Sequence, residues 1–294
     1  VTLIAQYNPI EYTITFNSDG EVISSLGYNI ESRISLPTAT KTGYTFNGWK
    51  PTINIGSWSS STTYSTDTTL TNMYGNVTLE AQWRANTYKI SYNLDGGSYG
   101  TYYPTTGTYD STVRISNPTK TGYTFAGWTA SGLNTSTAKY GTSSSQTTSW
   151  NGTTEVTNEY FKNLTSNSNA TVTLTANWRG NIYTIQFNSN GGTGAMVDMP
   201  ANYGKLFNLP INKFTREGYD FIGWATSQNG SVQFQNQESV SNLTTINNGT
   251  VTLYAVWKEK TYIVTLDANG GSVTPSTIEV TYNGTYGGNN GGIL

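Results

Sequence analysis

One seven-residue pattern recurs three times along this chain and constrains its fold more than any other feature. It reads Gly-Tyr-x-Phe-x-Gly-Trp and occupies residues 43–49, 122–128 and 218–224. Five identities over seven positions, found three times, indicate an internal repeat, and such repeats fold as a series of similar units. Two further patterns accompany it. Val-Thr-Leu-x-Ala-x-aromatic lies at residues 1–7, 77–83, 172–178 and 251–257, and an opening Tyr-x-apolar-x-apolar lies at 12–16, 88–92, 183–187 and 262–266.

These patterns divide the chain into a tandem array of end-to-end repeats. Residues 1–10 are expected to be the C-terminal end of a preceding repeat, followed by repeat 1 (11–83), repeat 2 (87–178), repeat 3 (182–257) and an incomplete repeat 4 (261–294) with a Gly/Asn-rich tail. The aromatic residue that closes each unit always precedes the next opening tyrosine by five positions, as from Trp83 to Tyr88. A short connector of constant length predicts a fixed geometry between neighbours. We expect the sequence to be an interior piece of a longer protein, with residues 286–292 disordered or truncated.

Repeat 2 is longer than the others, and its extra length lies in one place. A Ser/Thr/Asn/Gly-rich run at about residues 131–149 has no counterpart in repeats 1 and 3. Runs of this composition between patterned segments are typical of surface loops. The insertion is therefore predicted to be a lengthened loop.

Within one repeat the sequence predicts mainly β-structure with little helix. Alternation over residues 12–16 indicates a half-buried strand, and the Asx-Gly pairs that follow each opening strand supply the positive φ of a tight hairpin. Gly48, inside the third strand, predicts a β-bulge or a close backbone approach. Residues 77–83 are expected to form the last strand. Only short segments such as 154–164 could be helical.

The composition favours small cores built on aromatic rings. Aromatic residues make up 13% of the chain and charged residues only 11%. The six tryptophans that recur with the repeat are predicted to be core residues: Trp49, Trp83, Trp128, Trp178, Trp224 and Trp257. With a net charge of −2 and scattered basic residues, we expect neither nucleic-acid binding nor membrane insertion by this segment.

Catalysis and cofactor binding are not expected. The chain contains no histidine and no cysteine, so the commonest general base and the commonest transition-metal ligands are missing. The few carboxylates are scattered, and a lone Asx-Gly-Gly is more simply a turn than a Ca²⁺ site. An intramolecular Lys–Asn crosslink remains an alternative, but Lys41 and Lys120 share a position that Arg216 occupies in repeat 3, which favours a solvated basic position.

Five aromatic residues outside the repeat pattern are candidates for ligand binding. Trp58 and Trp150 lie in the variable segments, and Tyr99, Tyr102 and Tyr103 form a cluster just after a turn. Exposed rings of this kind can stack on sugars. The competing interpretation is that they close local hydrophobic clusters.

The three patterns together resemble the Listeria–Bacteroides repeat, the family that includes the B-repeat of internalin B. The match is clearest at residues 183–192, 217–224 and 251–257, and it covers essentially the whole chain. The resemblance implies small β-grasp-like modules in tandem on secreted or wall-attached bacterial proteins, without enzymatic activity. The first repeat departs from the family pattern, with Ser18-Asp19-Gly20-Glu21 in place of Asn-Gly-Gly.

The sequence thus predicts a non-catalytic stalk or adhesin array of an extracellular, cell-surface protein that displays a domain or mediates attachment. The alternative is a set of carbohydrate- or protein-binding modules with specificity in the variable loops. Expected partners are host or environmental glycans or proteins, or neighbouring copies of the chain joined through open sheet edges.

Overall fold

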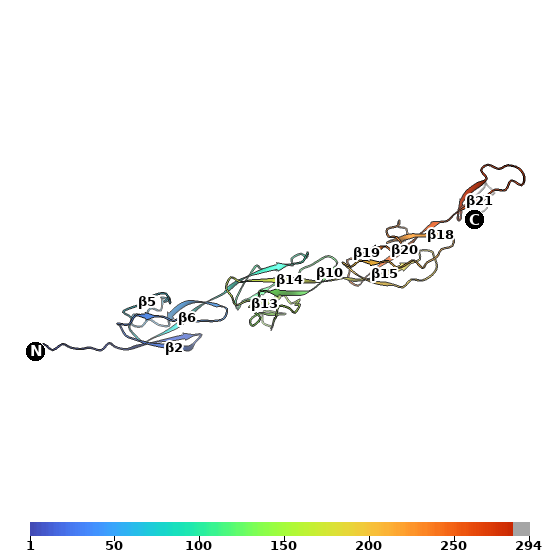
Figure 1. The fold of residues 1–294 in the computed structure, drawn as a ribbon. Helices are drawn as coiled ribbons and strands as arrows, with labels where there is room; N and C mark the ends of the chain where they lie inside the picture. The colour runs from blue at the N-terminus through green and yellow to red at the C-terminus, as the bar shows by residue number, and fades with distance from the viewer. Residues whose placement is uncertain (285–294) are drawn as a thin grey trace. The chain divides into compact units, whose positions relative to one another are not determined.

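The computed structural model describes residues 1–284, which contain strands and loops and no helix (Figure 1). They form two compact units, Val1–Pro118 with Ala126–Asn177, and Thr119–Phe125 with the residues from Trp178 onward. The predicted mainly β fold of tandem modules is confirmed. The helix considered for residues 154–164 is wrong, because part of that segment is a strand. The tail at residues 286–292 lies outside the described residues.

Each repeat contributes its own set of strands. Repeat 1 contains β1 (Tyr12–Ser18), β2 (Glu21–Tyr28), β3 (Ile34–Ser35), β4 (Tyr44–Pro51), β5 (Thr69–Leu70) and β6 (Val77–Ala85). Repeat 2 contains β7 (Thr87–Asn93), β8 (Thr106–Thr108), β9 (Thr112–Arg114), β10 (Tyr123–Ser131), β11 (Lys139–Gly141), β12 (Thr147–Ser149), β13 (Tyr160–Lys162) and β14 (Thr171–Gly180). Repeat 3 contains β15 (Ile182–Asn188), β16 (Met199–Asn202), β17 (Phe207–Asn208), β18 (Tyr219–Ala225), β19 (Ser239–Val240) and β20 (Gly249–Glu259), and β21 (Thr261–Thr265) and β22 (Thr277–Thr281) follow.

The same four-stranded sheet occurs three times. Its strand order is β2-β1-β6-β4 in repeat 1, β10-β14-β7-β8 in repeat 2 and β16-β15-β20-β18 in repeat 3. In each sheet the first and last long strands of the repeat form a central parallel pair, for example Ile14 opposite Val77. The end of one repeat therefore lies beside its own beginning.

The Asx-Gly pairs form turns as predicted, but among the described strands a tight hairpin follows only in repeat 1, because β8, β16 and β22 begin well beyond their turns, at Thr106, Met199 and Thr277. Asp19, Asp95, Asn190 and Asn269 all have φ between 44° and 54°, and the glycine after each also has a positive φ. Asx and Gly tolerate this region because their backbone can become left-handed at little steric cost. The predicted bulge at Gly48 is also confirmed. The β4–β6 register shifts between Phe46 and Gly48, and a Cβ on Gly48 would lie 2.6 Å from the carbonyl oxygen of Tyr64.

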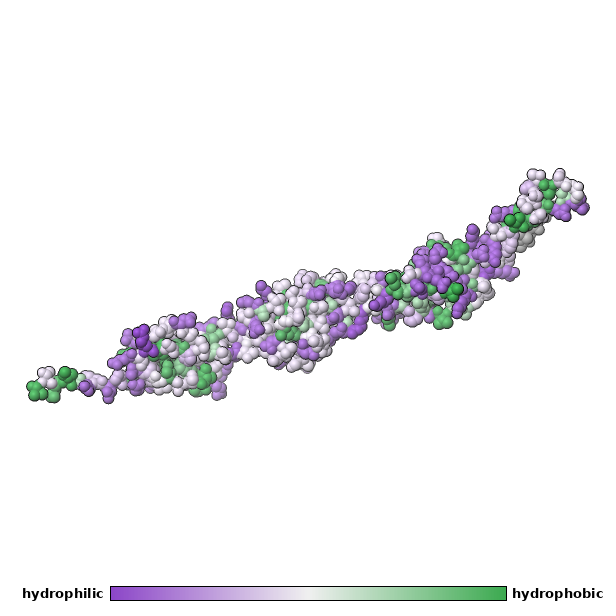
Figure 2. All heavy atoms as spheres, in the orientation of Figure 1, coloured by the Kyte–Doolittle hydropathy of each residue, from purple (hydrophilic) through white to green (hydrophobic). Residues whose placement is uncertain are grey.

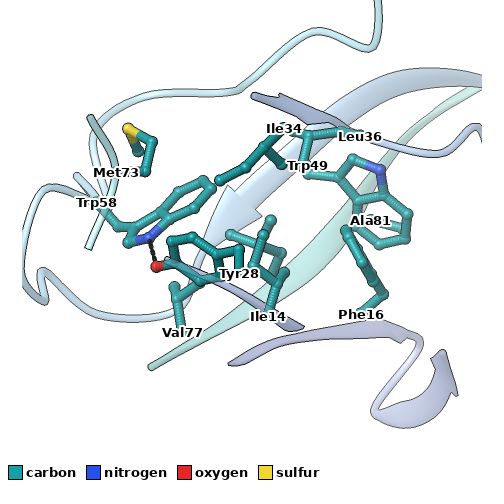
Figure 3. Close-up of a cluster of buried hydrophobic side chains, with 11 residues drawn as sticks. Ile14, Phe16, Tyr28, Ile34, Leu36, Trp49, Trp58, Met73, Val77 and Ala81 are labelled. Atoms are coloured by element: carbon teal, nitrogen blue, oxygen red, sulfur yellow. Dashed lines mark hydrogen bonds between the residues drawn. The ribbon is translucent and has the colours of Figure 1, made fainter. Parts of the chain in front are cut away.

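Each complete repeat packs around aromatic rings. Trp49, Trp128 and Trp224, from the repeated motif, are at most 1% exposed, whereas the predicted core residues Trp83, Trp178 and Trp257 are only partly buried. In repeat 1 the cluster runs from Ile14 to Ala81 (Figure 3). In repeat 3 it runs from Tyr183 to Ala255, and in both repeats every buried member lies inside its own repeat. These two repeats therefore have separate cores.

The insertion in repeat 2 is not the simple loop that its composition predicts. Strands β11 and β12, within residues 131–149, pair with each other, and β11 continues to β13 and β9 in a second four-stranded sheet. Phe161 on β13 is fully buried and its ring centroid lies 5.4 Å from that of Trp150. A polar, turn-rich sequence forms sheet here because flanking aromatic residues supply the buried side.

Residues 1–10 contain no strand, and the apolar side chains of Val1, Leu3, Ile4 and Tyr7 are exposed. This segment shows hydrophobic colour in Figure 2, while the repeats show mainly pale and hydrophilic colour with separate hydrophobic spots. The pairing of residues 1–10 with a preceding repeat stays a prediction. None of the described residues form a helix long and apolar enough to cross a bilayer.

Candidate functional site

Two features stand out as candidate sites: the joints between consecutive repeats, and an exposed tyrosine cluster in repeat 2. A joint is defined here as the single residue between the last strand of one repeat and the first strand of the next, with its contacts. β6 ends at Ala85 and β7 begins at Thr87, so joint 1 is centred on Asn86. Joint 2 is centred on Asn181 and joint 3 on Lys260 in the same way.

Asn86 bridges two repeats through all four of its polar groups. Its backbone N–H donates to the carbonyl of Gly43 at 2.8 Å, and its Oδ1 accepts from Thr45 Oγ1 at 2.6 Å, both in repeat 1. Its carbonyl accepts from the Tyr109 N–H at 2.8 Å, and its Nδ2 donates to the Ser166 carbonyl at 2.7 Å, both in repeat 2. Because Asn86 is only 9% exposed, losing any of these partners would leave a poorly hydrated polar group.

Joint 2 repeats this arrangement atom for atom. Asn181 donates from its backbone N–H to Gly122 and accepts from the Tyr203 N–H. Its side chain accepts from Thr124 Oγ1 and donates to the carbonyl of Thr245, each at 2.7 Å. Because the same four hydrogen bonds occur at two joints, the connection is a regular feature of the repeat rather than an incidental contact.

Joint 3 keeps the backbone bonds and changes the side chains. Lys260 donates from its N–H to Gly218 and accepts from the Tyr282 N–H, each at 2.9 Å. Asp220 occupies the place that Thr45 and Thr124 hold in the other joints. The Asn–Thr pair is thus replaced by a Lys–Asp pair.

A pair of tyrosine rings closes each joint. The ring centroids are 5.7 Å apart for Tyr44–Tyr109, 5.3 Å for Tyr123–Tyr203 and 5.8 Å for Tyr219–Tyr282, all edge to face. This is a favoured aromatic geometry, worth about 0.5–1.5 kcal/mol beyond burial. The first ring in each pair belongs to the Gly-Tyr-x-Phe-x-Gly-Trp motif and the second to the next repeat.

The first glycine of the motif makes room for the second ring. Gly43, Gly122 and Gly218 have φ of 81°, 76° and 74°, and a Cβ on each would lie 2.1–2.3 Å from the ring of Tyr109, Tyr203 or Tyr282. The Gly-Tyr half of the motif therefore serves the joint, and the Phe-x-Gly-Trp half serves the core. The sequence predicts a core position for the motif tryptophan, but it does not reveal the role of the motif glycine and tyrosine at the joint.

The recurring basic position also belongs to the joint. The charged groups of Lys41, Lys120 and Arg216 lie 4.5, 4.6 and 4.0 Å from the ring centres of Tyr44, Tyr123 and Tyr219. Cation–π contacts of this kind contribute about 0.5–1 kcal/mol at exposed sites.

In joint 1 the hydroxyl of the motif tyrosine also bonds to a carboxylate of the next repeat. Tyr44 Oη donates to Asp110 Oδ2 at 2.6 Å, and Asn163 Nδ2 donates to Asp110 Oδ1 at 3.1 Å. These two hydrogen bonds hold the pKa of the Asp110 carboxyl below its ordinary value, with Lys162 adding to the effect. The hydrogen bond from Tyr44 to Asp110 also raises the pKa of Tyr44 to about 12. Gly204 and Asn283 stand in the place of Asp110 in joints 2 and 3.

The five predicted ligand-binding residues divide into two groups. Trp58 and Trp150 are 2% and 1% exposed, so neither presents a face to a ligand, and the expectation that they stack on sugars is corrected. Trp58 Nε1 donates to Tyr28 Oη at 2.8 Å (Figure 3), and Trp150 Nε1 donates to the Thr154 carbonyl at 2.9 Å. Both indoles fill local cores because a partner for the N–H is available there.

Tyr99, Tyr102 and Tyr103 remain on the surface, at 52%, 46% and 50% exposure. They come from the segment between β7 and β8 and are called the tyrosine platform below. A shallow hollow of about 560 Å³ adjoins them, lined in part by Tyr102, Tyr103 and Arg114. The sequence places these three rings near one another, but it does not reveal Arg114.

Comparison with known proteins adds a family to this geometry. The model of the Listeria–Bacteroides repeat domain matches residues 12–82, 88–177 and 183–256, which is most of the chain. The chain belongs to the Listeria–Bacteroides repeat family. Each matched segment contains one copy of the repeated four-stranded sheet, so each Listeria–Bacteroides repeat is one structural module with a joint after it.

The relatives are longer bacterial proteins. The chain is 29% identical over 286 residues to a protein of Evansella cellulosilytica described as a Gly-rich membrane protein, and the match covers 92% of this chain and 28% of that protein. It is 27% identical over 273 residues to a second protein of that organism, also described as a membrane protein, and the match covers 92% of this chain and 35% of that protein. Internalin H of Listeria monocytogenes is 36% identical over 121 residues, which is 40% of this chain and 20% of that protein. The chain therefore spans only a minor part of the length of these relatives.

Proposed function

We propose that this array of Listeria–Bacteroides repeats is a non-catalytic spacer in a bacterial cell-surface protein, holding other parts of that protein at a set separation and orientation. The observation that carries the proposal is the four-bond bridge of Asn86 and its copy at Asn181. A flexible tether needs no such bridge. A spacer does, because its reach is kept only while neighbouring modules resist bending.

The chemistry of the surface supports this role. A spacer exposed to solvent on many sides benefits from a weakly charged, hydroxyl-rich surface, which gives few non-specific contacts. The relatives described as membrane proteins and as an internalin support a location at the cell surface for this chain too. With neither histidine nor cysteine in the sequence, a binding or mechanical role is favoured over catalysis.

Distance measurement between two spin labels tests the proposal. The chain has no cysteine, so Ser24→Cys in repeat 1 and Lys139→Cys in repeat 2 provide unique exposed attachment points that flank joint 1. We expect a narrow distance distribution that broadens in Asn86→Ala. Asn229→Ala, at an exposed turn, is the matched control and should leave the distribution narrow. A broad distribution in the unmodified background would refute the spacer function.

Attachment is a second candidate function, and two observations favour it. One is the tyrosine platform. The other is β2, an edge strand whose Val22, Ile23 and Leu26 side chains are exposed. An open apolar edge is suited to strand pairing with a neighbouring copy or another protein. Of the two, the platform offers the more specific chemistry.

A further inference from the structure

Among the three complete repeats, the tyrosine platform occurs in repeat 2. The corresponding connection in repeat 1 is the two-residue turn between β1 and β2, and the one in repeat 3, between β15 and β16, contains no tyrosine. The repeat fold therefore forms without these rings. Three half-exposed tyrosines that the fold does not need indicate a surface kept for contact with another molecule.

The platform is held rigidly. The Tyr102 N–H donates to Ser116 Oγ at 3.2 Å, and the Ser116 N–H donates back to the Tyr102 carbonyl at 2.8 Å. Gly100 packs so closely that a Cβ there would lie 2.6 Å from Ser116 Cβ. Tyr92 Oη donates to the Pro104 carbonyl at 2.7 Å, just past the platform. Little conformational freedom is left to be lost on binding, which lowers the cost of association.

Two rings of the platform stack on each other, and a hollow lies beside Tyr102 and Tyr103. Tyr99 and Tyr103 stack with centroids 4.7 Å apart and an interplanar angle of 27°. Tyr92 supports Tyr99 edge-on at 5.8 Å. Tyr102 and Tyr103 then border the hollow of about 560 Å³, with the hydroxyl-bearing side chains of Thr101 and Thr112 at its margin.

The positive charge of Arg114, which lines the hollow, is balanced by Glu159. The Arg114 guanidinium lies 4.4 Å from the Tyr102 ring centre, and its Nε and Nη2 atoms donate to Glu159 Oε2 at 2.9 and 2.8 Å. The pair leaves unused N–H donors and a carboxylate acceptor side by side. Neighbouring hydroxyls of a sugar, each both donor and acceptor, match this combination, whereas an anionic ligand would be opposed by Glu159.

We propose that repeat 2 binds a neutral oligosaccharide, with a pyranose ring stacked in the hollow between Tyr102 and Tyr103 and its hydroxyls bonded to Arg114 and Glu159. A proline-rich peptide would also stack on tyrosines, but it presents carbonyl acceptors only and would leave the carboxylate of Glu159 unused. A shallow site on a module of this kind binds weakly, and useful attachment would come from several copies acting together.

The test uses the whole chain on an array of neutral plant, fungal and bacterial oligosaccharides, together with heparin fragments and a proline decamer. The best binder is then titrated by calorimetry against Tyr102→Ala and Tyr103→Ala, with Tyr74→Ala, an exposed tyrosine of repeat 1, as the control. We expect binding of a neutral glycan that weakens at least tenfold in each platform variant and is unchanged in the control. Tyr103→Phe, which keeps the ring, should retain most of the affinity.

Three results would overturn the proposal: no neutral glycan bound at millimolar concentration, binding unaffected in the Tyr102→Ala, Tyr103→Ala double variant, or platform-dependent binding of only heparin or the proline peptide. Thermal unfolding of each variant shows whether repeat 2 remains folded. If a variant unfolds, nuclear magnetic resonance of the unmodified chain replaces it, since shifts centred on Tyr103 support the site and shifts elsewhere refute it. The outcome is independent of the spacer function, which depends on the joints.

Discussion

The Nζ atom of Lys260 lies 3.8 Å from Oδ1 of Asp220, at the two positions where joints 1 and 2 carry asparagine and threonine. Both partners have changed together, from a neutral hydrogen-bonded pair to an ion pair. A single change would leave one side unmatched: an asparagine facing an aspartate, or a lysine facing a threonine. The joints are therefore of two kinds: joints 1 and 2 pair asparagine with threonine, and joint 3 pairs lysine with aspartate.

A double-mutant cycle in joint 3 tests this matching. We expect Asp220→Thr and Lys260→Asn each to destabilise the packing of β21 and β22 on repeat 3, and the double variant to recover part of the loss by restoring the neutral pair. The Asp220 and Lys260 side chains are 65% and 43% exposed, so the ion pair itself should contribute no more than about 0.5 kcal/mol. Amide exchange at the Tyr282 N–H provides the readout at low and high salt. Additive losses that do not depend on salt would show that the two residues are not coupled.

The motif glycine of joint 2 gives a second prediction. Gly122→Ala places a methyl group about 2.3 Å from the Tyr203 ring at a φ of 76°, so it incurs both backbone strain and a steric clash. We expect a loss of about 2–4 kcal/mol in the stability of the joint, seen as faster exchange at the Tyr203 N–H.

Gly20→Ala is the matched control for that experiment. Gly20 has a φ of 86° but nothing within 4 Å of its would-be Cβ, so only the strain of about 1–2 kcal/mol applies. The difference between the stability losses of Gly122→Ala and Gly20→Ala measures the cost of the steric clash with the Tyr203 ring. Equal losses would mean that the Tyr203 ring moves aside freely and that Gly122 is needed only for its backbone conformation.

Joint 1 should depend on pH through Tyr44 and Asp110. The pKa of Asp110 is lowered in the fold, so its stabilising contribution is present above its ordinary pKa near 4 and is lost as the pH falls below that value. The pKa of Tyr44 is raised to about 12, so its contribution is present below about pH 10 and is lost as the pH rises toward 12. Asp110→Asn should bring the pKa of Tyr44 back toward 10, as measured from its ring carbon shifts. A Tyr44 pKa that is unchanged by Asp110→Asn would show that the hydrogen bond does not control it.

Trp58 supplies a prediction about the core. Because the indole is 2% exposed and donates to Tyr28, Trp58→Ala should destabilise repeat 1 by about 3–5 kcal/mol. Denaturant unfolding followed by far-ultraviolet circular dichroism measures the loss. A change in the free energy of unfolding below about 1 kcal/mol, together with altered glycan binding, would show that Trp58 is a surface residue that contacts ligand.

The sequence predicts those features of the fold that depend on a few adjacent residues. The Asx-Gly turns, the bulge at Gly48 and the closing strand at residues 77–83 each depend on a few adjacent residues. The composition of residues 131–149 predicts a loop, and the prediction is wrong because the pairing of this segment depends on β9 and β13, which lie outside it in the sequence.

The joints were hidden for a similar reason. Gly43 and Tyr109 meet across 66 positions, and nothing near either residue reveals the other. Comparison of the copies does carry the signal, since Asn86 and Asn181 both stand two residues before an opening tyrosine and Thr45 and Thr124 follow the motif tyrosine. The constant spacing predicted a stiff connector, but only the structure shows that a single residue carries it.

Hydrogen exchange at the joint amides tests the central claim most directly. In the intact chain, the backbone N–H groups of Asn86, Tyr109, Asn181 and Tyr203 should be protected to the same degree as amides in the central strands β6 and β14, because each donates to a partner across the joint or within it. Exchange of these four amides at the rate of an unstructured peptide, with the strands still protected, would show that the repeats fold separately and are tethered loosely, and the account of the joints would be wrong.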